Sequence, residues 1–168
     1  MKGMTFERLL PEQVTQADFD RMVELERNCG LPDPYPPSLI ASLLEEADTF
    51  VCRHEGDLIG FIMVTEHGKY FGGSVYIVNI NVSASFRGQG AAKRLILEAV
   101  RHYLKRRPDR LMSLDVTLSN PALRLYEKIG FRRTMLHSRN GNGDIVMAAP
   151  LKEIRQRLEA LLSAPEDA

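Results

Sequence analysis

Apolar positions with helical or alternating spacing divide the first third of the chain into a strand and two helices. Thr5–Leu10 predicts a short strand, and helices are predicted over Ala17–Asn28 and Ser38–Ala47. Asp18 is expected to cap the first helix. The proline-rich loop Leu31–Pro37 separates the two helices, because proline cannot continue the first one. In the first helix the spacing i, i+3, i+4 and i+7 is filled by Phe19, Met22, Val23 and Glu26. In the second helix the side chains expected to face inward are Leu39, Ile40, Leu43 and Leu44.

The rest of the chain alternates between predicted strands and helices around one nearly continuous apolar run, Val75–Val82. A long helix over residues 90–105 follows that run and carries an apolar stripe. From Leu151 onward an amphipathic helix is expected to pack either on the domain or on a second subunit of a homodimer. The remaining predicted elements are a hairpin over Thr49–Arg53 and Leu58–Glu66, a strand over Leu111–Leu118, a short helix over Pro121–Ile129 and a hairpin over Phe131–Ser138 and Asp144–Ala149.

The length of 168 residues, 44% of them hydrophobic, fits one domain with a single core. We expect residues 1–150 to form this domain and residues 151–168 to be its C-terminal helix and tail. No apolar run reaches the ~20 residues that span a bilayer, and no signal peptide is visible, so no membrane partner is expected. Two scattered cysteines, Cys29 and Cys52, fit a reducing cytoplasm.

The net charge of zero conceals an uneven distribution along the chain. Residues 1–84 hold six Lys/Arg and thirteen Asp/Glu, whereas residues 85–140 hold thirteen and four. The basic block suits a polyanionic ligand, and the acidic half suits either a cationic acceptor or ordinary solvated faces. The basic run Lys105–Arg107 has no interleaved aromatic residues, so a nucleic-acid partner is not expected.

A glycine turn, Arg87-Gly88-Gln89-Gly90-Ala91-Ala92, directly follows the central strand. Glycine lets backbone N–H groups approach a ligand closely, and the helix start that follows adds unpaired N–H donors and partial positive charge. A strand, a glycine turn and a helix start together predict a site for a phosphate-bearing ligand.

Two common phosphate loops do not match this turn. A nucleotide P-loop needs Gly-Lys-Ser/Thr, but here the turn ends in Ala91-Ala92. A dinucleotide fingerprint needs a small residue where Lys93 stands. A third interpretation is a glycine turn that only begins a helix and has no ligand. The remaining pattern, Arg-x-x-Gly-x-Gly/Ala, resembles the acetyl-CoA pyrophosphate loop of the GNAT N-acetyltransferases.

A second segment, Ser119–Phe131, resembles the GNAT pattern N-x-x-A-x-x-L-Y-x-x-x-G-F. Asn120 lies six residues before Tyr126, where the family usually has seven, so either the loop is shorter or Ser119 fills the position. The resemblance covers about residues 49–150. It implies the α/β (α+β) GNAT acyl-CoA N-acyltransferase fold, a mixed, mostly antiparallel central sheet flanked by helices, which makes residues 1–150 an N-acetyltransferase domain.

The resemblance also implies acetyl-CoA as co-substrate and no metal. In the family the loop amides bind the CoA pyrophosphate, and the preceding strand offers its backbone to the pantetheine arm. Asn79 and Asn81, at the end of the otherwise apolar strand, need hydrogen-bond partners if buried. The implied cofactor-binding residues are Ile80, Asn81, Val82, Arg87, Gly88, Gln89, Gly90, Ala91, Ala92 and Asn120.

For catalysis the resemblance places Tyr126 beside the thioester sulfur as general acid, although its apolar helix stripe also fits a core tyrosine. Some family members have a glutamate on the central strand where Tyr76 stands here. Asp115, in Leu114-Asp115-Val116, matches an acidic base on the next strand, and a plain hydrogen-bonding role is an alternative. Weaker candidates for the base are Glu66, His67 and a water relay.

The implied activity is transfer of an acetyl group from acetyl-CoA to a primary amine, by direct attack in a ternary complex. The acceptor is a small-molecule amine or a peptide, whether at its N-terminus or at a lysine. By family analogy, Tyr35 could line the acceptor site, with core packing as the alternative. A different-class alternative is an acyl-CoA-binding sensor without catalysis.

Overall fold

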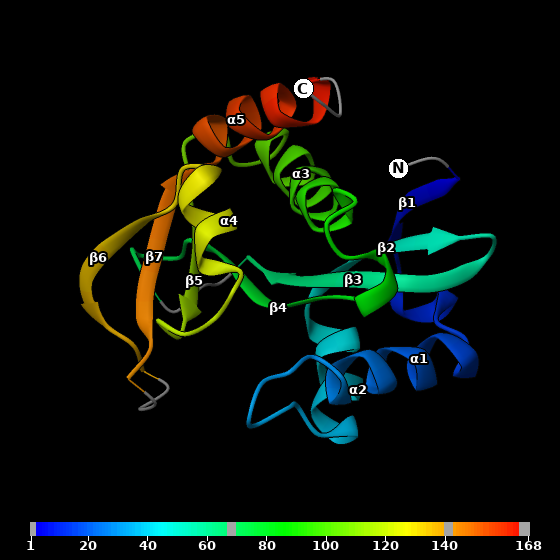
Figure 1. Ribbon diagram of the computed structural model, residues 1–168. Helices are drawn as coiled ribbons and strands as arrows, with labels where there is room; N and C mark the ends of the chain where they lie inside the picture. Colours follow the sequence, from blue (N-terminus) through cyan, green and yellow to red (C-terminus); the bar gives the residue numbers. More distant parts are fainter. Residues whose placement is uncertain (1–2, 67–69, 140–142, 165–168) are drawn as a thin grey trace. The chain divides into compact units, whose positions relative to one another are not determined.

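The computed structural model describes residues 3–66, 70–139 and 143–164 (Figure 1). Every predicted strand and helix is present within a few residues of its expected bounds. Two short 3-10 helices, η1 and η2, had no signal in the apolar pattern. In chain order the elements are β1 (Met4–Leu9), η1 (Pro11–Gln13), α1 (Gln16–Arg27), α2 (Pro37–Glu46), β2 (Asp48–His54), β3 (Asp57–Thr65), β4 (Val75–Val82), η2 (Ala84–Phe86), α3 (Ala91–Leu104), β5 (Leu111–Val116), α4 (Leu123–Lys128), β6 (Arg132–His137), β7 (Ile145–Pro150) and α5 (Leu151–Ser163).

The start of α1 and the end of β5 differ from the prediction. Thr15, not Asp18, caps α1: its hydroxyl accepts from the Asp18 N–H at 3.1 Å, and the Asp18 carboxylate accepts from the Thr15 N–H at 3.4 Å. This is a reciprocal capping box. Strand β5 ends at Val116, and Leu118 beyond it is 56% exposed instead of sharing the apolar face.

The strands are hydrogen bonded in the order β1-β2-β3-β4-β5-β7-β6. The β1–β2, β2–β3, β5–β7 and β6–β7 pairs are antiparallel. Strand β4 pairs with β5 in parallel, joining Val75 to Met112 and Tyr76 to Ser113. The sheet is therefore mixed and mostly antiparallel, as expected.

The chain forms two compact units. The first extends to Thr65 and includes Val78–Ala99, and the second comprises Glu66–Ile77 and the chain from Val100 onward. Both β4 and α3 contribute to each unit. In the first unit, the inward faces of α1 and α2 bury an apolar core with β1–β3. Its members are Leu9, Met22, Val23, Leu25, Ile40, Leu43, Leu44, Val51, Leu58, Phe61 and Met63. Leu39 of α2, which was expected to face inward, is instead 38% exposed.

The core of the second unit is covered in part by the C-terminal helix. Leu151, Ile154 and Leu158 of α5 are fully buried, and the Leu151 N–H donates to the Arg110 carbonyl at 3.1 Å. The apolar stripe of α5 therefore packs on its own chain, the first of the two arrangements expected for it. None of the described helices is long and apolar enough to cross a membrane.

Candidate active site

The glycine turn adopts a conformation that depends on its two glycines. Between η2 and the start of α3, Gly88 has φ of 78° and Gly90 has φ of 86°. These left-handed angles are costly for residues with a Cβ. A Cβ added to Gly88 would meet no atom within 4 Å, so the backbone conformation rather than crowding requires glycine there.

Side chains of the turn hold it in place. The Arg87 guanidinium donates to the Val82 carbonyl at 3.1 Å, and the Gln89 amide donates to the Ser85 carbonyl at 3.1 Å. Helix α3 begins at Ala91, and its first-turn N–H groups carry the positive end of the helix dipole. A glycine turn that leads into a helix start is typical of anion-binding sites. The cofactor-binding role of residues 87–92 stays a prediction.

The part of β4 that leads into this turn is only partly covered. Val78, Asn79, Ile80 and Val82 are half-buried, although β4 is an interior strand of the sheet. A central strand with partly exposed positions fits the predicted role of residues 80–82 in offering backbone to a ligand. Asn81 alone in this stretch is buried.

A buried carboxylate supplies the partner that the two asparagines required. Oε2 of Glu26 accepts from Asn79 Nδ2 at 2.7 Å and from Asn81 Nδ2 at 2.5 Å, and Oε1 accepts from the Tyr35 N–H at 2.8 Å. Glu26 is 3% exposed. The sequence signal was its position on the inward apolar face of α1, but nothing in the pattern identified its partners.

The loop between α1 and α2 lies against β4 within the first unit. The Tyr35 hydroxyl donates to the Val78 carbonyl at 3.2 Å, and its ring is half-buried against the core. Tyr35 therefore contacts the partly exposed stretch of β4, which is compatible with the predicted acceptor-side position and with packing.

In the second unit, Asp115 binds two tyrosines. Its Oδ1 accepts from the Tyr70 hydroxyl at 2.7 Å, and its Oδ2 accepts from the Tyr76 hydroxyl at 2.5 Å. The Arg139 N–H donates to the Tyr70 oxygen at 3.1 Å. Burial, with the Asp115 carboxylate as a smaller cause, raises the pKa of Tyr70 above its usual value. Sequence reasoning named Asp115 and Tyr76 separately and missed Tyr70, which lies outside any periodic segment.

Tyr126 lies on the short helix α4 with 6% of its surface exposed. Its ring meets the Phe131 ring edge-on, with centroids 5.8 Å apart, and the Phe131 N–H donates to the Tyr126 carbonyl at 2.9 Å. Gly130 between them has φ of 109°. The Tyr-x-x-x-Gly-Phe pattern thus closes the helix and fixes Tyr126 against Phe131. Burial raises the pKa of Tyr126 to about 12.

The side chain of Asn120 shapes the turn before α4. Its Oδ1 accepts from the Ala122 N–H at 2.9 Å, and its backbone carbonyl accepts from the Leu123 N–H at 3.0 Å. This is the local turn chemistry typical of asparagine. The cofactor-binding role of Asn120 stays a prediction.

The weaker candidates have other partners or lie outside the described residues. Glu66 pairs with Arg107 at 2.9 Å and with Arg106 at 3.3 Å, and His67 lies outside the described residues. Burial raises the pKa of Cys52 to about 11, which disfavours the nucleophilic thiolate. Within residues 3–66, 70–139 and 143–164, no cluster of His, Cys, Asp or Glu could hold a metal ion.

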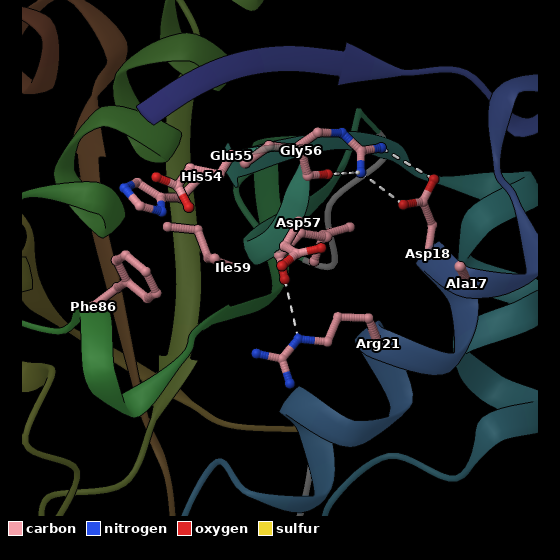
Figure 2. A pocket seen from close by; sticks show the side chains of 11 residues that line it. Ala17, Asp18, Arg21, His54, Glu55, Gly56, Asp57, Ile59 and Phe86 are labelled. Atoms are coloured by element: carbon pink, nitrogen blue, oxygen red, sulfur yellow. Dashed lines mark hydrogen bonds and ion pairs between the residues drawn. The ribbon is translucent and has the colours of Figure 1, made fainter. Parts of the chain in front are cut away.

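Figure 2 shows a cavity of about 460 Å³ in the first unit, at the β2–β3 hairpin. The Asp18–Arg53 ion pair, at 2.8 Å, forms part of its wall, and Arg21 donates to the Leu58 carbonyl beside it. The Phe86 ring lies 5.0 Å from the His54 ring. None of the predicted cofactor-binding or catalytic residues lines this cavity.

Comparisons with known proteins agree with this geometry. The acetyltransferase (GNAT) family model matches residues 14–131. Mycothiol acetyltransferase of Thermomonospora curvata is 39% identical over 90 residues, which cover 53% of this chain and 29% of that protein. N-alpha-acetyltransferase 40 of Saccharomyces cerevisiae is 24% identical over 147 residues, which cover 70% of this chain and 52% of that protein. The chain thus spans about half or less of the length of these curated relatives.

Solved structures share the fold. The ribosomal-protein-S18-alanine N-acetyltransferase from Escherichia coli matches with a TM-score of 0.68 and 22% identity, covering 88% of this chain and 94% of that one. Arabidopsis thaliana NAA60 in complex with acetyl-CoA matches with a TM-score of 0.68 and 23% identity, covering 89% and 99%. At these identities the likeness shows the fold alone, and that fold is the one expected from the sequence.

Proposed function

Because the chain belongs to the acetyltransferase (GNAT) family, we propose that it transfers an acetyl group from acetyl-CoA to a primary amine by direct attack. The observation that carries this proposal is the glycine turn, in which Gly88 and Gly90 take left-handed angles immediately before α3. That arrangement directs backbone N–H groups toward an anion.

Bound acetyl-CoA supplies an activated thioester. The chain's part is to hold it: the N–H groups of residues 88–92 bind the pyrophosphate, and the backbone of Ile80–Val82 binds the pantetheine arm. The basic residues 85–140 around the turn favour the highly charged cofactor electrostatically.

Asp115 is the proposed general base. An ammonium group must lose a proton before its nitrogen can attack, and Asp115 is a carboxylate already joined to the Tyr76 phenol at 2.5 Å. In this scheme the Tyr76 oxygen takes the proton from the amine while the Tyr76 proton moves to Oδ2 of Asp115. Tyr70, on Oδ1, holds the carboxylate in place.

Tyr126 stabilises the departing sulfur. A free thiol has a pKa of about 8.5, whereas burial raises the pKa of Tyr126 to about 12. Full proton transfer from this phenol to a thiolate is therefore uphill by roughly 5 kcal/mol. A hydrogen bond donated to the developing negative charge requires no such transfer, so we assign Tyr126 this role within the predicted general-acid position.

Transfer is tested with purified protein, acetyl-CoA and a panel of acceptors that includes polyamines, amino acids and peptides with free or blocked N-termini. We expect CoA release that depends on one acceptor class, with the acetylated product identified by mass spectrometry. A peptide acetylated at its first residue favours a peptide acceptor, and acetylation of a free small amine favours a metabolite. Binding of acetyl-CoA without transfer to any amine would contradict the enzyme proposal and favour the sensor.

A further inference from the structure

Glu26 is a buried carboxylate that faces N–H donors and, within the described part of the chain, no cation. Its three hydrogen-bond partners are the side-chain amides of Asn79 and Asn81 and the Tyr35 N–H. Two oxygens that accept three N–H bonds and donate none are the arrangement of an ionised carboxylate. Among the residues that the structure describes, none with a positive charge pairs with Glu26.

Such a group is unusual in a folded domain. Burial of an ionised carboxylate is costly unless it is hydrogen bonded and paired with opposite charge. Glu26 is hydrogen bonded by the asparagine amides, but among the described residues no opposite charge is paired with it. The negative charge in this part of the first unit therefore remains available to a cation that arrives from outside.

The position of Glu26 relative to β4 indicates which cation could respond to it. A Cβ placed on Gly60 would lie 3.2 Å from Val82 Cγ2 and 3.5 Å from Leu95 Cδ1, so Val82 and α3 share one side of the sheet. Successive strand residues point to opposite faces. Asn79 and Asn81 therefore lie on the other face, where their side chains donate to Glu26 of α1. Figure 1 shows α1 and the start of α3 on opposite sides of β3 and β4.

These two faces have different uses in the proposed reaction. Helix α3, which begins at the phosphate-binding turn, covers the face of Val82. An acceptor that attacks a ligand lying along β4 must reach it from a side that α3 does not cover. Asn79, whose side chain is half-buried, and the Tyr35 loop border the opposite face within the same unit.

We infer that Glu26 is a specificity-determining residue for the acceptor: its buried charge, held in place by the Asn79 and Asn81 amides, selects acceptors that arrive as ammonium cations. This inference rests on the proposed function. Glu26 attracts the positive nitrogen before deprotonation and disfavours acceptors that carry a carboxylate next to the amine. In partly buried surroundings, this attraction corresponds to roughly a tenfold or larger preference for a cation.

The test compares Glu26→Gln with the wild-type protein at saturating acetyl-CoA, using the best acceptor of the panel. We expect KM for that acceptor to rise about tenfold while kcat and the Kd for acetyl-CoA change less than twofold. Glu45→Gln is the matched control, because Glu45 is an exposed glutamate of α2 in the same unit. It removes the same charge from the surface and should leave KM unchanged.

A readout of charge separates this role from a structural one. Benzylamine is a cation at neutral pH and aniline is not, so the two are compared as competitive inhibitors of transfer. We expect the wild-type protein to prefer benzylamine and Glu26→Gln to lose that preference. A merely structural role would weaken both inhibitors by the same factor, and that result would overturn the inference.

A second variant keeps the test decisive if Glu26→Gln does not fold. Asn79→Lys places an ammonium group beside Glu26 inside the protein, where it should raise KM for the acceptor without lowering Tm. Unchanged KM in a folded Asn79→Lys protein would contradict the inference. Failure of the wild-type protein to acetylate any amine would instead refute the proposed function, so the two failures are distinguishable.

Discussion

The Tyr76 hydroxyl donates a 2.5 Å hydrogen bond to Oδ2 of Asp115, which joins the start of β4 to β5. The resemblance places Tyr76 where some family members have a glutamate, and it predicts Asp115 as an acidic base on the next strand. The contact makes one hydrogen-bonded pair of two residues that the sequence offered as separate candidates. A carboxylate next to a phenol can take over the proton-accepting role that a strand glutamate has elsewhere.

Asp115→Asn should lower kcat by about 10²–10³-fold, because an amide cannot accept the proton that the attacking amine must lose. Tyr76→Phe should have a smaller effect, about tenfold, since it removes the relay but keeps the carboxylate. Steady-state kinetics with the best acceptor measures both. Asp109→Asn, at an exposed side chain of the same unit, is the control. Unchanged kcat in Asp115→Asn would assign the base to a water instead.

Tyr126→Phe should reduce kcat by about tenfold to a hundredfold with little change in KM, because the lost hydrogen bond forms only as negative charge develops on sulfur. Tyr103→Phe removes a phenol from another fully buried ring and should leave kcat unaltered. Equal rates in Tyr126→Phe and wild-type protein would make Tyr126 a core residue only.

Burial of Tyr126 should make stability fall at alkaline pH. Its pKa is about 12 in the folded protein, against about 10 in an unfolded chain. As pH rises, Tyr126 therefore loses its proton in the unfolded state before it does so in the folded state. Its contribution to the free energy of unfolding is complete below pH 10 and is lost as pH rises towards 12. Urea unfolding measures the free energy of unfolding of the wild-type and Tyr126→Phe proteins at pH 9 and pH 11. The difference between the two proteins should change by about 1.4 kcal/mol from pH 9 to pH 11. An equal difference at both pH values would contradict this burial.

Asp18→Asn should destabilise the protein at neutral pH by about 1–3 kcal/mol, because the Arg53 guanidinium bonded to Asp18 would lose its charged partner. The hydrogen bond from Arg53 lowers the pKa of Asp18. That stabilisation is present above the usual Asp pKa and is lost as pH falls through the lowered value. The difference between variant and wild type, measured by urea unfolding, should therefore shrink in acid. Asp20→Asn, two residues further along α1 at an exposed position, should change stability little.

Gly88→Ala should weaken acetyl-CoA binding by about tenfold, because a left-handed residue with a Cβ costs roughly 1–2 kcal/mol and the turn will relax away from it. Gly56→Ala is a closely matched control: Gly56 also has positive φ, at 91°, and open space around its Cβ position. It lies in the β2–β3 hairpin, so it should lower stability without changing the Kd. Calorimetric titration measures the Kd for acetyl-CoA of each variant. Equal Kd values in Gly88→Ala and Gly56→Ala would show that the glycine turn does not bind the cofactor.

The glycine turn and the helix start after it could be predicted because all their determinants are local. Gly88, Gly90 and the start of α3 are contiguous, and the apolar run of β4 precedes them. The cap of α1 was predicted at Asp18 although Thr15 also has the right chemistry three residues earlier, which is the spacing of a capping box.

The polar contacts across the fold could not be predicted in the same way. Glu26 is 53 residues from Asn79 in the sequence, and Tyr70 is 45 residues from Asp115. Two asparagines at the end of an apolar strand implied a partner, but only the packing of α1 on β4 decides which side chain reaches Asn79 and Asn81. Tyr70 follows no periodic pattern, because residues 70–74 form neither helix nor strand.

Thermal unfolding with acetyl-CoA, compared with NAD and ATP at equal concentration, tests the central claim most directly. A ligand at a hundred times its Kd stabilises a protein by roughly 2.7 kcal/mol, which raises Tm by about 5 °C for a chain of this size. The account predicts this rise with acetyl-CoA and its reduction in Gly88→Ala but not in Gly56→Ala. No rise with acetyl-CoA, or an equal rise with NAD, would contradict the assignment of the glycine turn.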